Sequence, residues 1–146
     1  MYERILVPTD GSEGMDGVIE QAVELATVHD ATIHAVYVIN TASFANLPME
    51  TSWDGVSEML SNEGNAALDE VETLVDGRVP LERSLLEGAP SREIVRYAEN
   101  ENCDLIFMGT HGRGGIDRLL LGSVAEKVVR TSDVPVLTVR VSHDRD

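Results

Sequence analysis

The stretch that decides the fold is Leu105-Ile106-Phe107-Met108-Gly109-Thr110-His111-Gly112, which is followed after nine residues by Gly122-Ser123. Its first four residues form a short, continuous apolar run, as expected for a parallel strand that is buried on both faces. Gly109 and Gly112 carry no Cβ atom, so the backbone after the strand can turn tightly and its amides can face a ligand. The sequence therefore predicts a buried strand that ends in a glycine-rich loop.

A helix is expected directly after this loop. The apolar residues beyond the loop recur at helical spacing: Val124, Ala125, Val128 and Val129. Gly122-Ser123 then lies at the helix start, where serine can cap the helix and where the unpaired N–H groups and the helix dipole favour an anion. A strand, a glycine-rich loop and a helix start in this order predict a phosphate-binding site.

Two better-known phosphate motifs are absent from the sequence. No G-x-x-x-x-G-K-[ST] occurs, and the segment that starts at Gly112 and Gly114 has Asp117 where G-x-G-x-x-G needs its third glycine. Without the motif lysine, the phosphate charge has to be offset by amides, by a metal ion or by arginines such as Arg113 and Arg118. Each of these arginines is equally suited to an ion pair with a neighbouring acid. The missing lysine favours binding over rapid phosphoryl transfer.

Strand and helix patterns alternate along the rest of the chain. The expected strands cover Ile5 to Val7, Thr32 to Ile39, Leu81 to Leu86, Asp104 to Met108 and Val136 to Val141. Helical patterns separate the strands, with Ser12 as the expected cap of the first helix and Pro90 in the first turn of the third. A longer loop from Asn40 to Ser52 is suited either to closing over a ligand or to simple mobility. The alternation predicts an α/β fold of parallel strands joined by helical crossovers.

Several segments together resemble the universal stress protein family. The spacing Gly109-x-x-Gly112, nine residues, Gly122-Ser123 is similar to the nucleotide-binding signature of its ATP-binding branch. The other similar segments follow in order: Ile5-Leu6-Val7-Pro8-Thr9-Asp10-Gly11-Ser12, Tyr37-Val38-Ile39-Asn40, Glu87-Gly88-Ala89-Pro90 and Val134-Pro135-Val136-Leu137-Thr138-Val139. The resemblance covers nearly the whole chain and is weakest between Asn40 and Gly77.

The resemblance implies a single Rossmann-like domain over residues 1–146, a doubly wound sheet of five parallel strands in the order 3-2-1-4-5 with helices on both faces. Ligands of such sheets bind at the switch point, which here lies between strands one and four. Carried over by position, the resemblance places the following residues around a nucleotide: Pro8, Thr9, Asp10, Val38, Met108, Gly109, Gly112, Gly122, Ser123 and Val124. Asp10 is expected near the ribose or phosphates and a metal, and Val38 and Met108 at the adenine. On pattern alone, core packing is the more ordinary role for Val38 and Met108.

The implied function is that of an ATP-binding stress-response protein, with ATP, AMP or ADP as ligand, with Mg²⁺, and with at most slow hydrolysis. Two alternatives stay open: a genuine ATPase or phosphotransferase that uses Asp10 and an arginine, and a dimeric partner-binding module that takes AMP or another small ligand. The four histidines form no motif with a nucleophile, and His111 fits a solvent-facing spacer as well as a phosphate contact. No catalytic residue is therefore predicted.

The composition limits the cellular location and the binding partners that are expected for this protein. The formal net charge is −15, and the basic residues are ten arginines and one lysine, which argues against nucleic-acid binding. The acidity and the near-absence of lysine favour a salt-rich cytoplasm, with ordinary acidity as the alternative. No apolar run approaches the roughly 18 residues of a membrane span, and the N-terminus lacks a signal-peptide pattern, so a cytoplasmic protein is expected. Cys103 is the only cysteine, and it is expected to be a small buried side chain.

The final strand, Val136-Val141, is apolar and is expected at an edge of the sheet. An exposed apolar edge invites pairing with another chain unless something covers it. The residues after the strand, His143 to Asp146, are too short and polar for a cover. Members of the resembled family commonly form homodimers through this strand, so the resemblance implies a homodimer with two-fold pairing.

Overall fold

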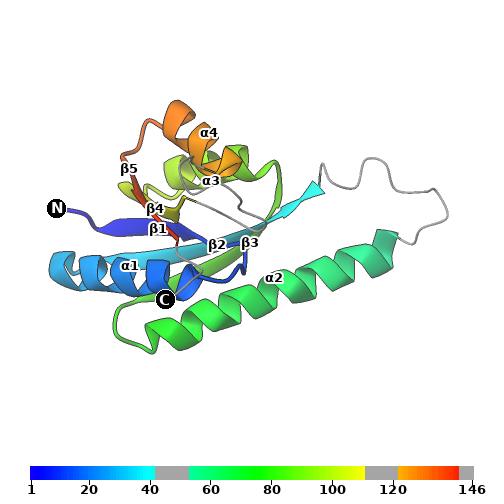
Figure 1. The fold of residues 1–146 in the computed structure, drawn as a ribbon, viewed down its shortest axis with the longest axis horizontal. Helices are drawn as coiled ribbons and strands as arrows, with labels where there is room; N and C mark the ends of the chain where they lie inside the picture. Colours follow the sequence, from blue (N-terminus) through cyan, green and yellow to red (C-terminus); the bar gives the residue numbers. More distant parts are fainter. Residues whose placement is uncertain (42–52, 111–121, 142–146) are drawn as a thin grey trace.

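The computed structural model describes residues 1–41, 53–110 and 122–141, and these residues build one five-stranded parallel sheet. The strands are β1 (Arg4–Pro8), β2 (Thr32–Asn40), β3 (Leu81–Gly88), β4 (Leu105–Gly109) and β5 (Val136–Val139). Their order across the sheet is β3-β2-β1-β4-β5 (Figure 1). The expected fold class, strand order and edge position of the last strand are confirmed.

Helices cover both faces of the sheet. The helices are α1 (Met15–His29), α2 (Trp53–Val75), α3 (Pro90–Asn100) and α4 (Ser123–Thr131). Figure 1 shows α1 and α2 on one side of the sheet and α3 and α4 on the other. The side chains of β2 divide accordingly, because successive residues of a strand point to opposite faces. Ile33 and Tyr37 belong to the core on the α1 and α2 side, whereas Val36 belongs to the core on the α3 and α4 side.

Two of the expected helix caps are wrong. The N-cap of α1 is Gly14 rather than Ser12, and its φ of 91° is a left-handed conformation that glycine adopts without steric cost. The N-cap of α4 is Gly122, so Ser123 is already the first helical residue, and no side-chain hydrogen bond caps this helix. Pro90 does lie in the first turn of α3, as expected from its fixed φ and missing N–H group.

The strand bounds differ from the expected ones at both sheet edges. β3 continues to Gly88 because its pairing with β2 extends to Asn40 opposite Gly88, whose φ of 140° disfavours any other residue. β5 ends at Val139, which pairs with Gly109 at the end of β4, so the expected strand as far as Val141 is too long. Val141 lies beyond the strand and is buried, with 7% of its surface exposed.

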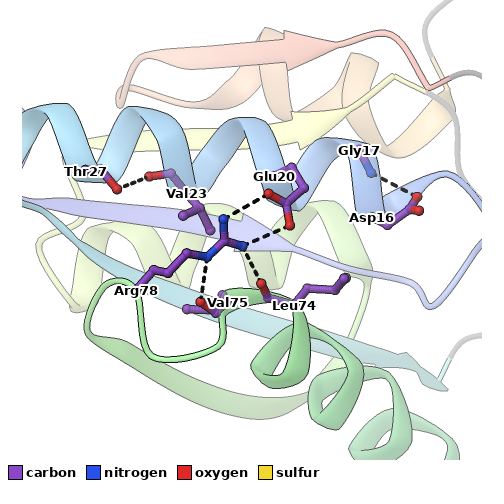
Figure 2. Close-up of polar contacts among 8 residues, drawn as sticks. All are labelled: Asp16, Gly17, Glu20, Val23, Thr27, Leu74, Val75 and Arg78. Carbon is purple, nitrogen blue, oxygen red and sulfur yellow. Dashed lines mark hydrogen bonds and ion pairs between the residues drawn. The ribbon is translucent and has the colours of Figure 1, made fainter.

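Arg78, just after α2, ties this helix to α1 (Figure 2). Its guanidinium group donates two hydrogen bonds to the carboxylate of Glu20 on α1, with N–O distances of 3.1 and 2.9 Å. The same group donates to the carbonyl oxygens of Leu74 and Val75 in the last turn of α2. Such carbonyls lack an intrahelical donor, so one side chain both completes the end of α2 and fixes its position beside α1.

Candidate functional site

The expected switch point is present between β1 and β4. These strands are neighbours in the sheet but are far apart in sequence. After β1 the chain continues to α1 on one face, and after β4 it continues to α4 on the other (Figure 1). The two connections diverge from adjacent strand ends, and in sheets of this class the resulting crevice is where ligands bind.

The segment after β1 is held by hydrogen bonds of its own. The N–H group of Thr9 donates to the carbonyl oxygen of Val36 at 2.9 Å, and the buried Thr9 hydroxyl accepts from the N–H group of Gly11 at 3.1 Å. The Asp10 carboxylate accepts from the N–H group of Ser12 at 2.9 Å. These bonds fix Asp10 directly beyond the carboxyl end of β1, at the switch point.

The end of β4 and the start of α4 are joined through Thr110, to which the sequence pattern assigned no role. The Thr110 N–H group donates to the carbonyl oxygen of Val139 at 2.8 Å, and the Thr110 carbonyl oxygen accepts from the N–H group of Gly122. The structure therefore brings Gly109 and Gly122 close together, as the glycine signature requires. No sequence signal points to Thr110, because the hydrogen bonds that join the two segments are made by its backbone groups.

The first turn of α4 presents backbone donors. The first intrahelical hydrogen bond runs from the N–H group of Glu126 to the carbonyl oxygen of Gly122 at 2.9 Å. The N–H groups of Ser123, Val124 and Ala125 consequently have no acceptor within the helix. Together with the helix dipole, these three groups form a positive end next to β4, as an anion needs.

Val38 and Met108 both take part in the core between the sheet and the α3 and α4 layer. Met108 is buried and Val38 is half-buried against the same cluster. Pro8, the last residue of β1, is in register with Val36, so Val38 extends past the end of β1 on the neighbouring strand. This position places Val38 next to the crevice. Core packing accounts for the burial of both Val38 and Met108, and contact of either side chain with a nucleotide base stays a prediction.

Part of the expected site lies outside the described residues. This applies to Gly112 and His111, and to the two loop arginines Arg113 and Arg118. Nearly all of the expected loop from Asn40 to Ser52 lies outside them as well. Among the residues that the structure describes, no group of three or more His, Cys, Asp or Glu side chains is arranged to hold a metal ion.

Ser12 lies beside the site and does not have the expected role as the N-cap of α1. Its hydroxyl oxygen is buried and has no hydrogen-bond partner among the residues that the structure describes. A buried hydroxyl without a partner costs about 1 kcal/mol or more, whereas a capping serine contributes about 1 kcal/mol. We therefore expect Ser12→Ala to raise the free energy of unfolding of the ligand-free protein by about 1 kcal/mol in a urea titration. A fall of similar size would show that the hydroxyl caps α1 after all.

Cys103 matches its expected structural role. Its thiol is buried between α3 and β4. Burial raises the pKa of the Cys103 thiol to about 12, so the thiolate that reactive cysteines use is not formed near neutral pH.

None of the helices in the described ranges combines the length and the apolar character needed to cross a bilayer.

The fold and the crevice define a doubly wound α/β protein of the class that binds ligands at its switch point. The model of the universal stress protein family matches residues 1–140. Universal stress protein MJ0531 of Methanocaldococcus jannaschii is 42% identical over 141 residues, which cover 96% of this chain and 83% of that protein. The universal stress protein of Methanothermobacter thermautotrophicus is 39% identical over 144 residues, which cover 96% and 97%. The chain belongs to the universal stress protein family.

Solved structures share the fold. Hypothetical protein MJ0577 of Methanocaldococcus jannaschii matches with a TM-score of 0.86 and 28% identity over 99% of both chains. A universal stress protein in complex with cAMP matches with a TM-score of 0.72 and 25% identity, over 97% of this chain and 98% of that one. The second structure shows that a protein of this fold and family binds a nucleotide.

Proposed function

We propose that this protein is a nucleotide-binding stress-response protein of the ATP-binding branch, which holds ATP in the crevice between β1 and β4. The observation that carries the proposal is the start of α4. Three backbone N–H groups without an intrahelical acceptor stand there, and the Gly122 to Thr110 hydrogen bond ties them to the end of β4. This arrangement supports phosphate binding by backbone amides, which needs no lysine.

Each part of the nucleotide has a proposed neighbour. Pro8, Thr9 and Asp10 lie on the β1 side, and the adenine is placed against Val38 and Met108. The ribose and phosphates take the remaining positions, which are Gly109, Gly112, Gly122, Ser123 and Val124. The cAMP complex of a family member supports a nucleotide in this fold. The triphosphate itself is inferred from the spacing of the glycine signature.

Magnesium fits this site as an ion that arrives with the phosphates. Mg²⁺ in nucleotide sites keeps several waters and is bound by one or two carboxylates together with phosphate oxygens. Asp10 supplies one carboxylate beyond β1, and the described residues hold no preformed cluster of three ligands. Bound there, the ion would offset phosphate charge, while Asp10 would orient it through the carboxylate that the Ser12 N–H group holds in place.

The proposed role is binding, with at most slow hydrolysis, so that the nucleotide state biases conformation or the choice of partner. Fast transfer needs a positioned base and strong charge stabilisation. The rival ATPase or phosphotransferase would use Asp10 and an arginine. Turnover near one per second that disappears in Asp10→Ala while ATP affinity is retained would favour that rival.

Titration calorimetry tests the proposal, on protein from which copurified nucleotide has been removed. ATP, AMP, cAMP and inorganic phosphate are titrated with and without Mg²⁺ at several salt concentrations. We expect one ATP per chain, with an affinity that exceeds that of phosphate because base and ribose also contribute. Tighter binding of AMP than of ATP would favour the partner-binding module. Absence of ATP binding by folded protein would refute the proposal. ATP binding that is retained in concentrated salt would support the separate expectation of a salt-rich cytoplasm.

We further propose that the protein acts as a homodimer of single domains paired through β5. No strand of the described residues pairs with the outer edge of β5, and this supports the proposal because the edge offers backbone groups to a second strand. Leu137 on this strand is 37% exposed and lines an open hollow beside α1, where Leu25, Val28 and Phe107 supply apolar surface and Gln21 and Glu24 supply polar surface. An antiparallel copy of the strand would pair the edge and bring apolar side chains over this hollow.

A charge on the edge strand is expected to break the dimer. Leu137→Asp places a carboxylate in the hollow, so we expect sedimentation velocity to show a monomer where the unaltered chain is a dimer. Met59→Asp is the matched control, because Met59 is 61% exposed on α2, which packs on β2 and β3 at the other side of the sheet, and it should leave the dimer intact. A dimer that persists in Leu137→Asp, or a monomeric unaltered chain, would refute pairing through β5.

A further inference from the structure

A buried polar pair lies at the other end of the sheet from the crevice. His34 is near the amino end of β2, and only 2% of its surface is exposed. Its register neighbours are Leu6 on β1 and Glu82 on β3. Leu6 belongs to the core on the α3 and α4 side, so His34 faces α3. A buried histidine in a central strand has to be neutral or paired, because burial disfavours its charged form.

The partner of His34 is Tyr97, on the last turns of α3. The His34 Nδ1 atom lies 2.9 Å from the Tyr97 hydroxyl oxygen, and the two rings meet edge to face with centroids 5.8 Å apart. Burial raises the pKa of Tyr97, and a side-chain hydrogen bond with Ser84 on β3 lowers it by less. With the proton of neutral His34 assigned to Nε2, the Tyr97 O–H group donates to His34 Nδ1. This chain of hydrogen bonds links β3, α3 and β2.

The charged groups around His34 leave its neutral form favoured. Burial lowers the pKa of His34 most, and Arg4 on β1 lowers it further. Glu82 on β3 and Glu101 at the end of α3 act in the opposite direction, and they are outweighed. The remaining titratable neighbour of Tyr97 is the buried Cys103 thiol after α3, which is uncharged near neutral pH.

We propose that His34 and Tyr97 form a pH-sensitive latch, which holds α3 on the sheet when His34 is neutral and releases it when His34 is protonated. A proton on Nδ1 removes the acceptor for the Tyr97 O–H group, and it places a charge in the core between α3 and the sheet. Further attachments of α3 include the buried side chains of Ile94 and Ala98 and a hydrogen bond from Arg4 to the Glu101 carbonyl oxygen. α3 also packs against α4, so its release would be felt next to the crevice.

The direction of the pH effect follows from the lowered pKa of His34. As the pH falls through about 6.5, a histidine that is exposed by opening or unfolding binds a proton before the buried one does. Opening is therefore favoured by up to about tenfold for each pH unit below 6.5, until the buried His34 itself titrates. Above pH 6.5 the latch stays closed and this dependence disappears. The latch does not require a bound nucleotide.

Amide hydrogen exchange on the nucleotide-free protein tests the latch. Protection factors are measured by NMR at pH 7.5 and pH 5 for amides of α3 and, as an internal reference, for amides of α1. We expect protection of α3 to fall severalfold relative to α1 at pH 5. The imidazole of His34 should titrate below 6.5 in the same spectra. Equal falls in α1 and α3, no fall, or a His34 pKa at or above 6.5 would overturn the proposal.

Two variants and a matched control separate the latch from general stability. His34→Gln keeps a hydrogen-bonding group but does not titrate, so the difference between pH 7.5 and pH 5 should disappear. Tyr97→Phe keeps the ring and should move α3 protection at pH 7.5 towards the value of the unaltered chain at pH 5. His29→Gln removes the histidine that contacts Tyr2 at the end of α1, and it should leave the α3 response unchanged. A response that survives in Tyr97→Phe and His34→Gln would also overturn the latch.

Discussion

Gly122→Val is expected to lower the affinity for ATP about a hundredfold or more, which corresponds to about 3 kcal/mol of binding free energy. Gly122 is the N-cap of α4, and the three N–H groups proposed for the phosphates follow it directly. An isopropyl group at this position stands where a phosphate has to approach those N–H groups. The backbone at Gly122 has φ −63° and ψ 157°, which valine adopts without strain. The substitution therefore acts on the site, with an N-cap cost of about 1 kcal/mol or less.

Gly17→Val is the matched control for this substitution. Gly17 lies on α1, and a Cβ atom there would meet nothing within 4 Å. Calorimetric titration should give an unchanged ATP affinity for Gly17→Val and a strongly reduced one for Gly122→Val, with both variants folded by circular dichroism. Unchanged affinity in Gly122→Val would show that the segment from Gly109 to Ser123 is only a connection between β4 and α4.

Gly64→Val is expected to cost about 2 to 3 kcal/mol of unfolding free energy, because it overpacks the core. Gly64 is buried in the middle of α2, on the side that faces β2 and β3. A Cβ atom there would stand 2.5 Å from Leu85 Cδ1 and 2.8 Å from Tyr37 Cδ1. The leucine methyl can rotate away, but the tyrosine ring is buried against the core, so α2 itself has to move. The absence of a side chain at Gly64 is what lets α2 approach β2 and β3.

The same control serves the stability measurement. Gly17→Val makes an identical change in the first turn of α1 with free space around it, so helix propensity alone should keep its effect within about 0.5 kcal/mol. Urea denaturation of both variants at constant pH gives the comparison. If Gly64→Val were no less stable than Gly17→Val, the close approach of α2 to the sheet would be wrong.

The strands could be predicted because buried parallel strands leave a strong local pattern, whereas their order across the sheet was implied by the family resemblance. The apolar run from Leu105 to Met108 ends at Gly109, and β4 ends at the same residue. The helix caps were predicted less well, since they depend on one backbone angle. Ser12 has the right side chain for a cap, but Gly14 takes the left-handed conformation two residues later and starts α1 there.

The candidate site, like the fold, could be predicted from the sequence only in part. The end of β1 and the start of α4 could be placed from glycines and strand ends, because the crevice follows from strand order. Contacts that join distant segments left no pattern in the sequence. His34 and Tyr97 are 63 residues apart, and Arg78 and Glu20 are 58 apart. Each pair forms only when the sheet and its helices are assembled, so neither pair could be predicted from residue type or spacing.

The most direct test of nucleotide binding between β1 and β4 is an NMR titration of ¹⁵N-labelled protein with ATP and Mg²⁺. The largest amide shifts are expected at Asp10, Gly109 and Val124, around the carboxyl ends of β1 and β4. The amide of His34, at the amino end of β2, should barely move. Shifts that cluster away from the crevice, or no shifts at several times the ATP concentration that saturates a typical site, would contradict a nucleotide site in this protein.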